Sequence, residues 1–277
     1  MYITDKQIQD YRRDGYLLLP ALFSPEEVQA MKDELPAVFA EDSPARVMEK
    51  ESGVVRSVYG SHRTHEIFAR MVRDPRLLVP AQRLLEDEVY VHQFKINAKL
   101  AFQGEVWEWH QDYIFWRNED GMPTENVVTV ALFLDEVTEF NGPLLFVPGS
   151  QRGGVIEPRA RRDGDEGEES WKADVSATLS YTVQQDTLAE LVSESEITAP
   201  KGPAGSVLFF DGNVVHGSAP NMSPFDRMLA LVTYNAVSNA PAPRENPRPD
   251  FLCSRDFTPV TPLESDAPAD ELALASA

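Results

Sequence analysis

The hydrophobic pattern changes character near residue 88, and this change constrains the fold more than any other feature of the chain. Before that point apolar residues recur mainly at helical spacing. After it, short runs rich in Val, Ile, Phe, Tyr and Thr alternate with Gly, Pro and Asn, which is typical of antiparallel β architectures. Strand and helix do not alternate regularly, so a parallel sheet is not expected. We therefore expect residues 1–87 to be mostly helical and residues 88–240 to form a mainly β barrel or sandwich with flanking helices.

Capping signals mark where the first helices begin. Thr4 and Gln7 form a predicted capping box, and Gly15 ends that helix. The run 24–27, with sequence SPEE, supplies a serine N-cap, a proline at the first helical position and a glutamate at the third. Residues 64–87 again show helical spacing, interrupted by a proline. The expected strands are 16–19, 89–99, 105–111, 127–135, 144–147, 206–211 and 228–235.

Two segments fall outside this pattern. Residues 157–201 interrupt the strands, and we interpret them as a solvated insertion that is either a lid or a plain surface loop. The tail over 241–277 is proline-rich and is expected to cross the surface in extended form. Together these parts predict one domain over residues 1–277. The insertion carries an acidic cluster of Asp163, Asp165, Glu166, Glu168 and Glu169.

Charge and composition exclude several functions. The 277 residues include 25 Lys plus Arg and 45 Asp plus Glu, which gives a net charge of −20. Such a chain is repelled by nucleic-acid phosphates and by anionic membranes, so an anionic ligand needs a few cations inside a pocket. No apolar run reaches the ~18 residues of a membrane span, and the start lacks a signal-peptide core. The lone Cys253 forms no disulfide within the chain, and a cytoplasmic location is expected.

Three side chains form a candidate metal site. His110 and Asp112 stand two residues apart in a strand-like stretch, where alternate side chains share a face. His216 follows another apolar strand far downstream. Two imidazoles and one carboxylate leave coordination positions open, which is the pattern of a non-haem Fe(II) oxygenase. The alternative is an ordinary buried histidine paired with a nearby aspartate.

A cation follows this candidate site. Arg227 lies eleven positions after His216 and begins an apolar strand. Its planar guanidinium suits a carboxylate held by two hydrogen bonds beside the metal. The alternative is a surface pair with a nearby acid such as Asp226.

These residues resemble the phytanoyl-CoA dioxygenase-like branch of Fe(II)/2-oxoglutarate oxygenases. The likeness extends to the run 141–150, NGPLLFVPGS, although Gln151 stands where that branch often has histidine. The runs 92–99 and 109–116 are more narrowly similar to bacterial free-proline hydroxylases that produce trans-4-hydroxyproline. Ectoine hydroxylases are similar too, since they share Gln93, Lys99, Trp116 and the Glu-Asp-Gly-Met motif.

The resemblance implies a double-stranded β-helix, or jelly roll, and an enzyme that couples C–H hydroxylation to decarboxylation of 2-oxoglutarate to succinate. His110, Asp112 and His216 would bind Fe(II), and O2 would be the oxidant, with ascorbate supportive. Arg227 would hold the distal carboxylate of 2-oxoglutarate. Two further co-substrate contacts are implied, from the Thr129 hydroxyl and from Lys99.

Substrate contacts are expected near the metal motif. In the run 91–99 Gln93, Lys95, Asn97 and Lys99 share one face, which suits a polar cavity or equally a face in water. The opposite, apolar face would carry His92 as a packed core residue; His62 and His65 receive no role. Candidate walls are Trp116 and Tyr113, with core packing as the alternative for Trp116. Candidate partners of a substrate carboxylate are Arg117, Arg56 and Lys95, with a solvated surface as the alternative for both arginines, and Gln93 is a neutral partner.

The expected reaction is hydroxylation of free L-proline to trans-4-hydroxy-L-proline. The first alternative is another small amino or imino acid, such as ectoine or pipecolate. The second is a non-catalytic metal-binding jelly roll. A zinc hydrolase fits poorly, because no glutamate base adjoins the ligand pair. The sequence does not determine the oligomeric state.

Overall fold

The computed structural model describes residues 2–157 and 170–263. The predicted acidic cluster (Asp163, Asp165, Glu166, Glu168 and Glu169) and the last 14 residues of the tail lie outside the described residues. In the described part no helix is both long enough and apolar enough to cross a bilayer.

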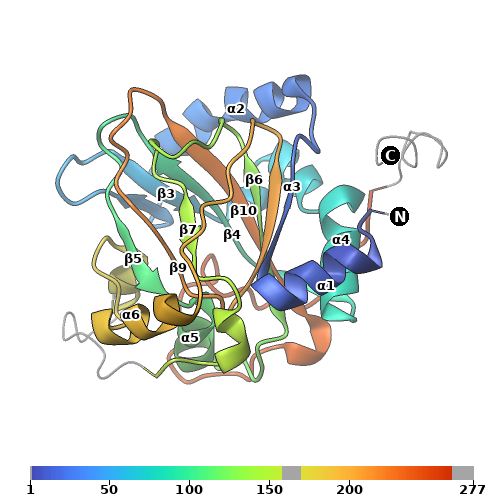
Figure 1. The fold of residues 1–277 in the computed structure, drawn as a ribbon. Helices are drawn as coiled ribbons and strands as arrows, with labels where there is room; N and C mark the ends of the chain where they lie inside the picture. Colours follow the sequence, from blue (N-terminus) through green and yellow to red (C-terminus); the bar gives the residue numbers. More distant parts are fainter. Residues whose placement is uncertain (1, 158–169, 264–277) are drawn as a thin grey trace.

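Two antiparallel sheets form the centre of the fold (Figure 1). The larger has seven strands in the order β1-β8-β6-β10-β4-β3-β2, and the smaller has three in the order β5-β9-β7. Side chains of both sheets, such as Phe146, Phe210 and Leu231, form one apolar cluster between them. The strands are β1 (Tyr16–Leu19), β2 (Arg46–Met48), β3 (Val55–Tyr59), β4 (Val89–Lys99), β5 (Trp107–His110), β6 (Val127–Phe133), β7 (Leu144–Phe146), β8 (Val207–Asp211), β9 (His216–Ser218) and β10 (Arg227–Ala236).

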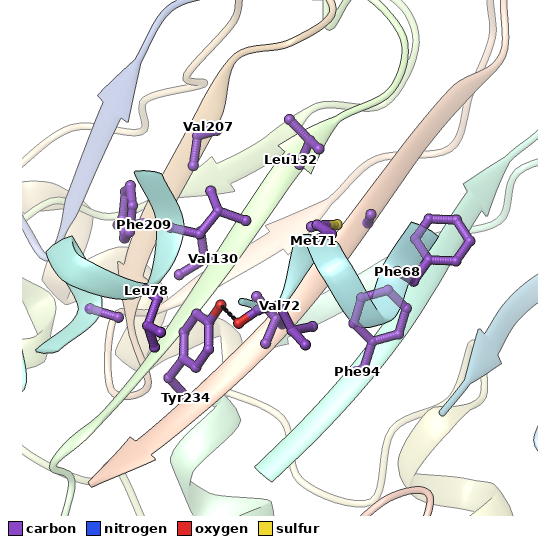
Figure 2. Close-up of a cluster of buried hydrophobic side chains, with 14 of the residues drawn as sticks. Phe68, Met71, Val72, Leu78, Phe94, Val130, Leu132, Val207, Phe209 and Tyr234 are labelled. Atoms are coloured by element: carbon purple, nitrogen blue, oxygen red, sulfur yellow. Dashed lines mark hydrogen bonds between the residues drawn. The ribbon is translucent and has the colours of Figure 1, made fainter. Parts of the chain in front are cut away.

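Helices cover the other face of the larger sheet (Figure 1). Figure 2 shows Phe68 and Met71 packed over the strands, and the Tyr234 hydroxyl donating to the carbonyl of Val72 at 2.8 Å. Burying this layer of side chains supplies much of the apolar stabilisation of the fold. The helices are α1 (Asp5–Asp14), α2 (Pro25–Ala40), α3 (Glu66–Met71), α4 (Pro75–Leu85), α5 (Asp112–Phe115) and α6 (Gln185–Glu194), with a π-helical turn η2 (Trp116–Asp120) and short 3-10 turns η1 (Ser61–Arg63), η3 (Ser150–Gly153), η4 (Ser170–Val175) and η5 (Val237–Asn239).

The predicted helix starts are confirmed. Thr4 and Gln7 form a reciprocal capping box, and Gly15 ends α1 in the left-handed region at φ 81°. Ser24 caps α2 through the backbone of Glu27. The break expected near Pro75 separates α3 from α4, because proline cannot supply the donor that a continuous helix needs.

Two parts of the first third differ from the expectation. β2 and β3 fall within residues expected to be mostly helical, and they extend the larger sheet by pairing with each other and then with β4. Strands of three and five residues carry too few alternating positions to stand out in a sequence. Beyond the sheets, the tail returns along β4, since Ser254 N donates to His92 O at 2.9 Å and Val260 N to Val89 O at 2.8 Å.

Candidate metal centre and co-substrate pocket

Three buried side chains converge at one end of the three-stranded sheet. His110 ends β5, His216 begins β9, and the two residues pair across these strands. Asp112 Oδ1 lies 3.6 Å from His110 Nε2, and Asp112 Oδ2 lies 3.9 Å from His216 Nε2. One donor atom from each residue lies within 4.8 Å of the other two, so a single ion can contact all three. The structure therefore brings the three predicted ligands together.

Asp112 reaches this point from the start of a helix. Our expectation that it shares a strand with His110 was wrong, because β5 ends at His110 and α5 begins at Asp112. The intervening Gln111 donates its side-chain amide to the carbonyl of Asn213 at 2.6 Å. This contact ties the turn to the segment just before His216, and it is a tertiary interaction that strand alternation does not encode.

Backbone carbonyls fix the orientation of both imidazoles. His110 Nδ1 lies 2.6 Å from Glu108 O, and His216 Nδ1 lies 3.0 Å from Val214 O. A carbonyl oxygen only accepts, so each Nδ1 carries a hydrogen and each Nε2 is turned towards Asp112. Such outer contacts are the usual means of presenting a histidine to a metal.

The charges of the site suit a divalent cation. Burial alone would raise the pKa of Asp112, but Lys95 and the two imidazoles hold it below its ordinary value. Burial, followed by the neighbouring His110, lowers the pKa of His216 to about 4. At neutral pH the site therefore offers a carboxylate and a neutral imidazole, the forms that bind metal. Two imidazoles and one carboxylate with open positions fit Fe(II).

A second buried cluster also contains a histidine and an aspartate, here with a cysteine, but its charges do not suit a metal ion. His92, Asp120 and Cys253 also have ligand atoms within 4.8 Å of one another. Here Arg248 donates to both oxygens of Asp120, at 2.8 and 2.7 Å, so the carboxylate is already neutralised by a cation. Burial raises the pKa of Cys253 to about 12, which keeps the thiol protonated. A divalent ion would face a guanidinium at close range and lack a thiolate.

Arg227 lies inside the barrel, and its Nε donor is unused. Its Nη2 donates to Gly142 O at 2.8 Å and to Ser218 Oγ at 3.3 Å, while its buried Nε has no partner in the described structure. The alternative of a surface pair with Asp226 is excluded, because Arg227 is 1% exposed and Asp226 accepts from the backbone of Ala101. Leaving a buried donor unpaired is costly, and a carboxylate would satisfy it.

Lys99 lies beside Arg227 across the β4–β10 pair. Its Nζ donates to Glu105 O at 2.6 Å and to Ala219 O at 2.5 Å. Burial and the charge of Arg227 lower the pKa of Lys99 to about 6. The neutral amine has two hydrogens, which these two carbonyls satisfy, and protonation would add a third.

Thr129 lies elsewhere on the sheet. Its hydroxyl is 3.1 Å from that of Thr233, its partner on β10, six residues further along the strand than Arg227. At ~3.3 Å per residue the two positions are roughly 20 Å apart. Thr129 and Arg227 therefore cannot contact the same carboxylate, and the contact expected of Thr129 stays a prediction.

A cavity opens beside the metal centre. It is lined by His110 and Asp112 together with Tyr59, Gln93, Lys95, Trp107, Phe115, Trp116, Asp174, Val175, Leu179 and Arg248. Three of the predicted substrate contacts, Gln93, Lys95 and Trp116, are in this lining. Lys95 Nζ lies 5.8 Å from the centroid of the Trp107 ring, and its charge also acts on Asp112.

The other predicted substrate contacts lie outside the lining. Tyr113 packs in an apolar cluster, and its hydroxyl donates to Met122 O at 3.3 Å. Arg117 forms an ion pair with Glu157, with its side chain one-third exposed. Arg56 is fully buried and pairs with Glu49 at 2.8 Å, so the solvated alternative for it is wrong.

His92 is buried, as expected of a core residue, but its neighbours are polar and not apolar. A register shift opposite Thr233 and Tyr234 moves it off the apolar face of β4. Its Nε2 lies 3.2 Å from Asp120 Oδ2, and its ring meets Trp116 edge-on with centroids 5.8 Å apart. Sequence reasoning also missed Arg248 and Asp174. They come from the tail and the insertion, and neither stands in a pattern that points to a site.

Comparisons with known proteins agree with this geometry. The chain matches the family model described as phytanoyl-CoA dioxygenase (PhyH) over residues 11–229. It is 42% identical over 256 residues to an L-proline trans-4-hydroxylase of Streptomyces griseoviridis, covering 92% of this chain and 94% of that protein. It is 38% identical over 272 residues to an ectoine dioxygenase of Bordetella bronchiseptica, covering 95% and 86%.

Solved structures give the same result. EctD from S. alaskensis with 2-oxoglutarate and 5-hydroxyectoine has a TM-score of 0.80 at 34% identity, covering 95% of this chain and 88% of that one. The same enzyme with bound Fe has a TM-score of 0.78. The expected jelly-roll fold, with its iron and 2-oxoglutarate chemistry, is confirmed. The chain therefore belongs to the phytanoyl-CoA dioxygenase family, as a member of its Fe(II)- and 2-oxoglutarate-dependent dioxygenases.

Proposed function

We propose that this protein hydroxylates free L-proline to trans-4-hydroxy-L-proline and converts 2-oxoglutarate to succinate and CO2 in the same turnover. The observation that carries the proposal is the buried group of His110, Asp112 and His216 within one barrel that also holds Arg227, whose buried Nε has no partner in the described structure. The choice of proline rests on the higher identity to a proline hydroxylase, 42%, than to an ectoine dioxygenase, 38%.

The residues have separate tasks in this reaction. Bound Fe(II) supplies the activation of O2 and the oxidation of an unactivated C–H bond, which side chains alone do not perform. Asp112 and the two imidazoles would hold the ion from one side. Arg227 would bind the distal carboxylate of 2-oxoglutarate, with Lys99 beside it. Holding both reactants in place against the metal supplies the orientation that the chemistry requires.

The side chains that line the cavity have the chemistry that a small zwitterion needs. Trp116, Phe115 and Tyr59 provide aromatic walls for a compact apolar ring and exclude water from it. Lys95 would provide a cation for the substrate carboxylate, and Asp174 would provide an acceptor for the ring ammonium. Arg248 is a second cation in the wall, although Asp120 and Asp174 already neutralise much of its charge.

The test is mass spectrometry of proline incubated with the protein, Fe(II), ascorbate and 2-oxoglutarate. We expect a product 16 Da heavier than proline, with the stereochemistry of an authentic trans-4-hydroxyproline standard, and one succinate per product. Ectoine and pipecolate, run in parallel, test the first alternative, which the 34% identity and 0.80 TM-score to EctD favour. Turnover of either of these without turnover of proline would overturn the choice of proline.

A non-catalytic role is tested separately. Anaerobic addition of 2-oxoglutarate to the Fe(II)-loaded protein should produce the weak visible absorption of a chelate between the metal and the keto acid. Absence of that band, with iron bound, would favour a metal-binding jelly roll without oxygenase activity.

A further inference from the structure

Asp120 is a buried carboxylate to which the proposed reaction assigns no task. It ends the π-helical turn η2, four residues after Trp116, and is 4% exposed. Arg248 Nε donates to its Oδ1 at 2.8 Å and Arg248 Nη2 to its Oδ2 at 2.7 Å. His92 Nε2 lies 3.2 Å from the same Oδ2. Both carboxylate oxygens are therefore used within the protein.

The interactions continue into the larger sheet on one side. The Tyr90 hydroxyl lies 3.4 Å from His92 Nδ1 and accepts from Asn235 Nδ2 at 2.9 Å. Residues of β4 and β10, the most extensively paired strands, thus stand behind Asp120. His92 also contacts the edge of Trp116, so the same residue supports an aromatic wall of the cavity.

On the other side, the interactions reach two segments outside the sheets. Arg248 belongs to the tail, and its Nη1 lies 3.3 Å from Asp174 Oδ2 in the insertion. The second oxygen of Asp174 accepts from Ser180 Oγ at 2.6 Å. Arg248 and Asp174 both line the cavity beside the metal ligands. Asp120 is therefore the point at which the rigid sheet meets the two irregular segments that complete the cavity wall.

Charge makes this connection strong. A buried guanidinium held by two parallel hydrogen bonds to a carboxylate is a directional contact, and removal of one partner leaves an uncompensated buried charge. Without the Asp120 carboxylate, Arg248 would retain only the 3.3 Å contact to Asp174 among its carboxylate partners, and solvent would compete for it. The tail would then lose its fixed position against β4.

We propose that Asp120, supported by His92, is a positioning residue that fixes Arg248, Asp174 and the edge of Trp116 in the wall of the substrate cavity. The proposal rests on the proposed function in one respect, namely that this cavity receives the amino-acid substrate. It distinguishes the two co-reactants, because 2-oxoglutarate would be held by Arg227 and Lys99, whose hydrogen bonds among the described residues go to Gly142, Ser218, Glu105 and Ala219.

The experiment compares Asp120→Asn, Asp120→Glu and Glu27→Gln with the unaltered full-length enzyme. Asp120→Asn keeps the size of the side chain but removes its charge, and Asp120→Glu restores the charge. Glu27→Gln is the matched control, since it converts a carboxylate that faces Arg76 to an amide on the helical side of the sheet. All variants are first checked for a cooperative thermal unfolding transition.

Kinetics give the first readout. For Asp120→Asn we expect the KM for the amino-acid substrate to rise at least tenfold, the KM for 2-oxoglutarate to stay within about twofold, and more succinate to form per hydroxylated product. In Asp120→Glu the KM for the amino-acid substrate should return part of the way to the value of the unaltered enzyme. Glu27→Gln should leave both KM values unchanged. Equal increases in both KM values, or no change in either, would overturn the proposal.

Hydrogen–deuterium exchange gives a readout that does not depend on activity. The amides of Leu252 and Cys253 donate to Pro249 O, and that of Ser254 donates to His92 O. Asp120→Asn should accelerate exchange in peptides covering 249–257 and 171–176, and Glu27→Gln should not. Unchanged exchange there would also overturn the proposal. If Asp120→Asn does not fold, His92→Phe is measured instead, with a KM increase of about threefold expected.

The failure of the proposed function would look different. In that case the unaltered enzyme would show no turnover of any small amino or imino acid. The exchange data would still decide whether Asp120 holds the tail and the insertion in place.

Discussion

His110 and His216 lie directly opposite each other on β5 and β9, with ring centroids 4.2 Å apart, although more than a hundred residues separate them in the chain. The pairing of two short strands therefore assembles most of the metal site. The buried Phe146 of β7 stacks on His216, with centroids 5.7 Å apart and an interplanar angle of 22°. The smaller sheet thus positions two of the three candidate metal ligands, while the larger sheet carries Arg227 and Lys99.

Removal of the carboxylate ligand should abolish both iron binding and hydroxylation. In Asp112→Ala the two imidazoles remain, but the only anionic ligand is lost. We expect at least a hundredfold fall in product formation and loss of stoichiometric iron after desalting, measured by elemental analysis. Asp10→Ala, which removes a carboxylate from the surface of α1, is the control and should retain both properties. Near-normal activity of Asp112→Ala would contradict the metal assignment.

Loss of the buried guanidinium should act on one co-reactant. Arg227→Gln leaves the barrel without the donor that now lacks a partner. The KM for 2-oxoglutarate should rise at least tenfold, while the KM for the amino acid changes little, and steady-state kinetics with each reactant varied in turn will show this. A rise in the KM for the amino acid, with little change in that for 2-oxoglutarate, would mean that Arg227 binds the substrate instead.

Much of this arrangement could be predicted from the sequence. Alternation along 89–99 identified the polar face of β4, and the cavity lining contains Gln93 and Lys95 from that face. The positions of His110, His216 and Arg227 were informative because those residues sit at strand ends, where the register fixes their direction, whereas Asp112 begins α5. Local periodicity was sufficient in these places.

The remaining part of the site depends on tertiary contacts. His92 left its expected face because of an irregularity in the pairing of β4 with β10, and a single strand does not reveal how its partner pairs. Arg248 and Asp174 come from segments without periodicity, and their positions follow from a shared ion pair. Arg117 is near the metal motif in sequence, yet it turns outward to Glu157, because the π-helical turn η2 changes the direction of successive side chains.

Binding of 2-oxoglutarate should take up a proton. Burial and the charge of Arg227 lower the pKa of Lys99 to about 6, so the amine is mostly neutral at pH 7.5. A dianion placed beside it raises that pKa, and Lys99 then binds a proton. Anaerobic titration calorimetry in buffers of different ionisation enthalpy should show uptake approaching one proton at pH 7.5 and much less below pH 6. In Lys99→Met the observed binding enthalpy should no longer depend on the buffer. If that dependence were unchanged, the proton would be bound by another group.

Two neighbouring histidines should make opposite contributions to the pH dependence of stability. Burial lowers the pKa of His62 to about 4 from an ordinary 6.5. Between these two pH values the unfolded chain binds a proton at His62 that the folded protein does not bind. His62 therefore destabilises the fold as pH falls from about 6.5 to 4, by up to about 3 kcal/mol.

Burial also opposes the charge of His65, but Glu34 at 2.6 Å and Glu41 at 2.9 Å raise its pKa overall. The protonated His65 therefore stabilises the folded state fully below pH 6.5, and this contribution is lost as pH rises through the pKa that His65 has in the folded protein. The free energy of unfolding, measured in urea at pH 7.5, 6.5 and 5.5, should fall less towards acid for His62→Phe than for the parent protein. For His65→Gln it should fall more. If the free energy of unfolding of both variants changed with pH as it does in the parent, both assignments would be wrong.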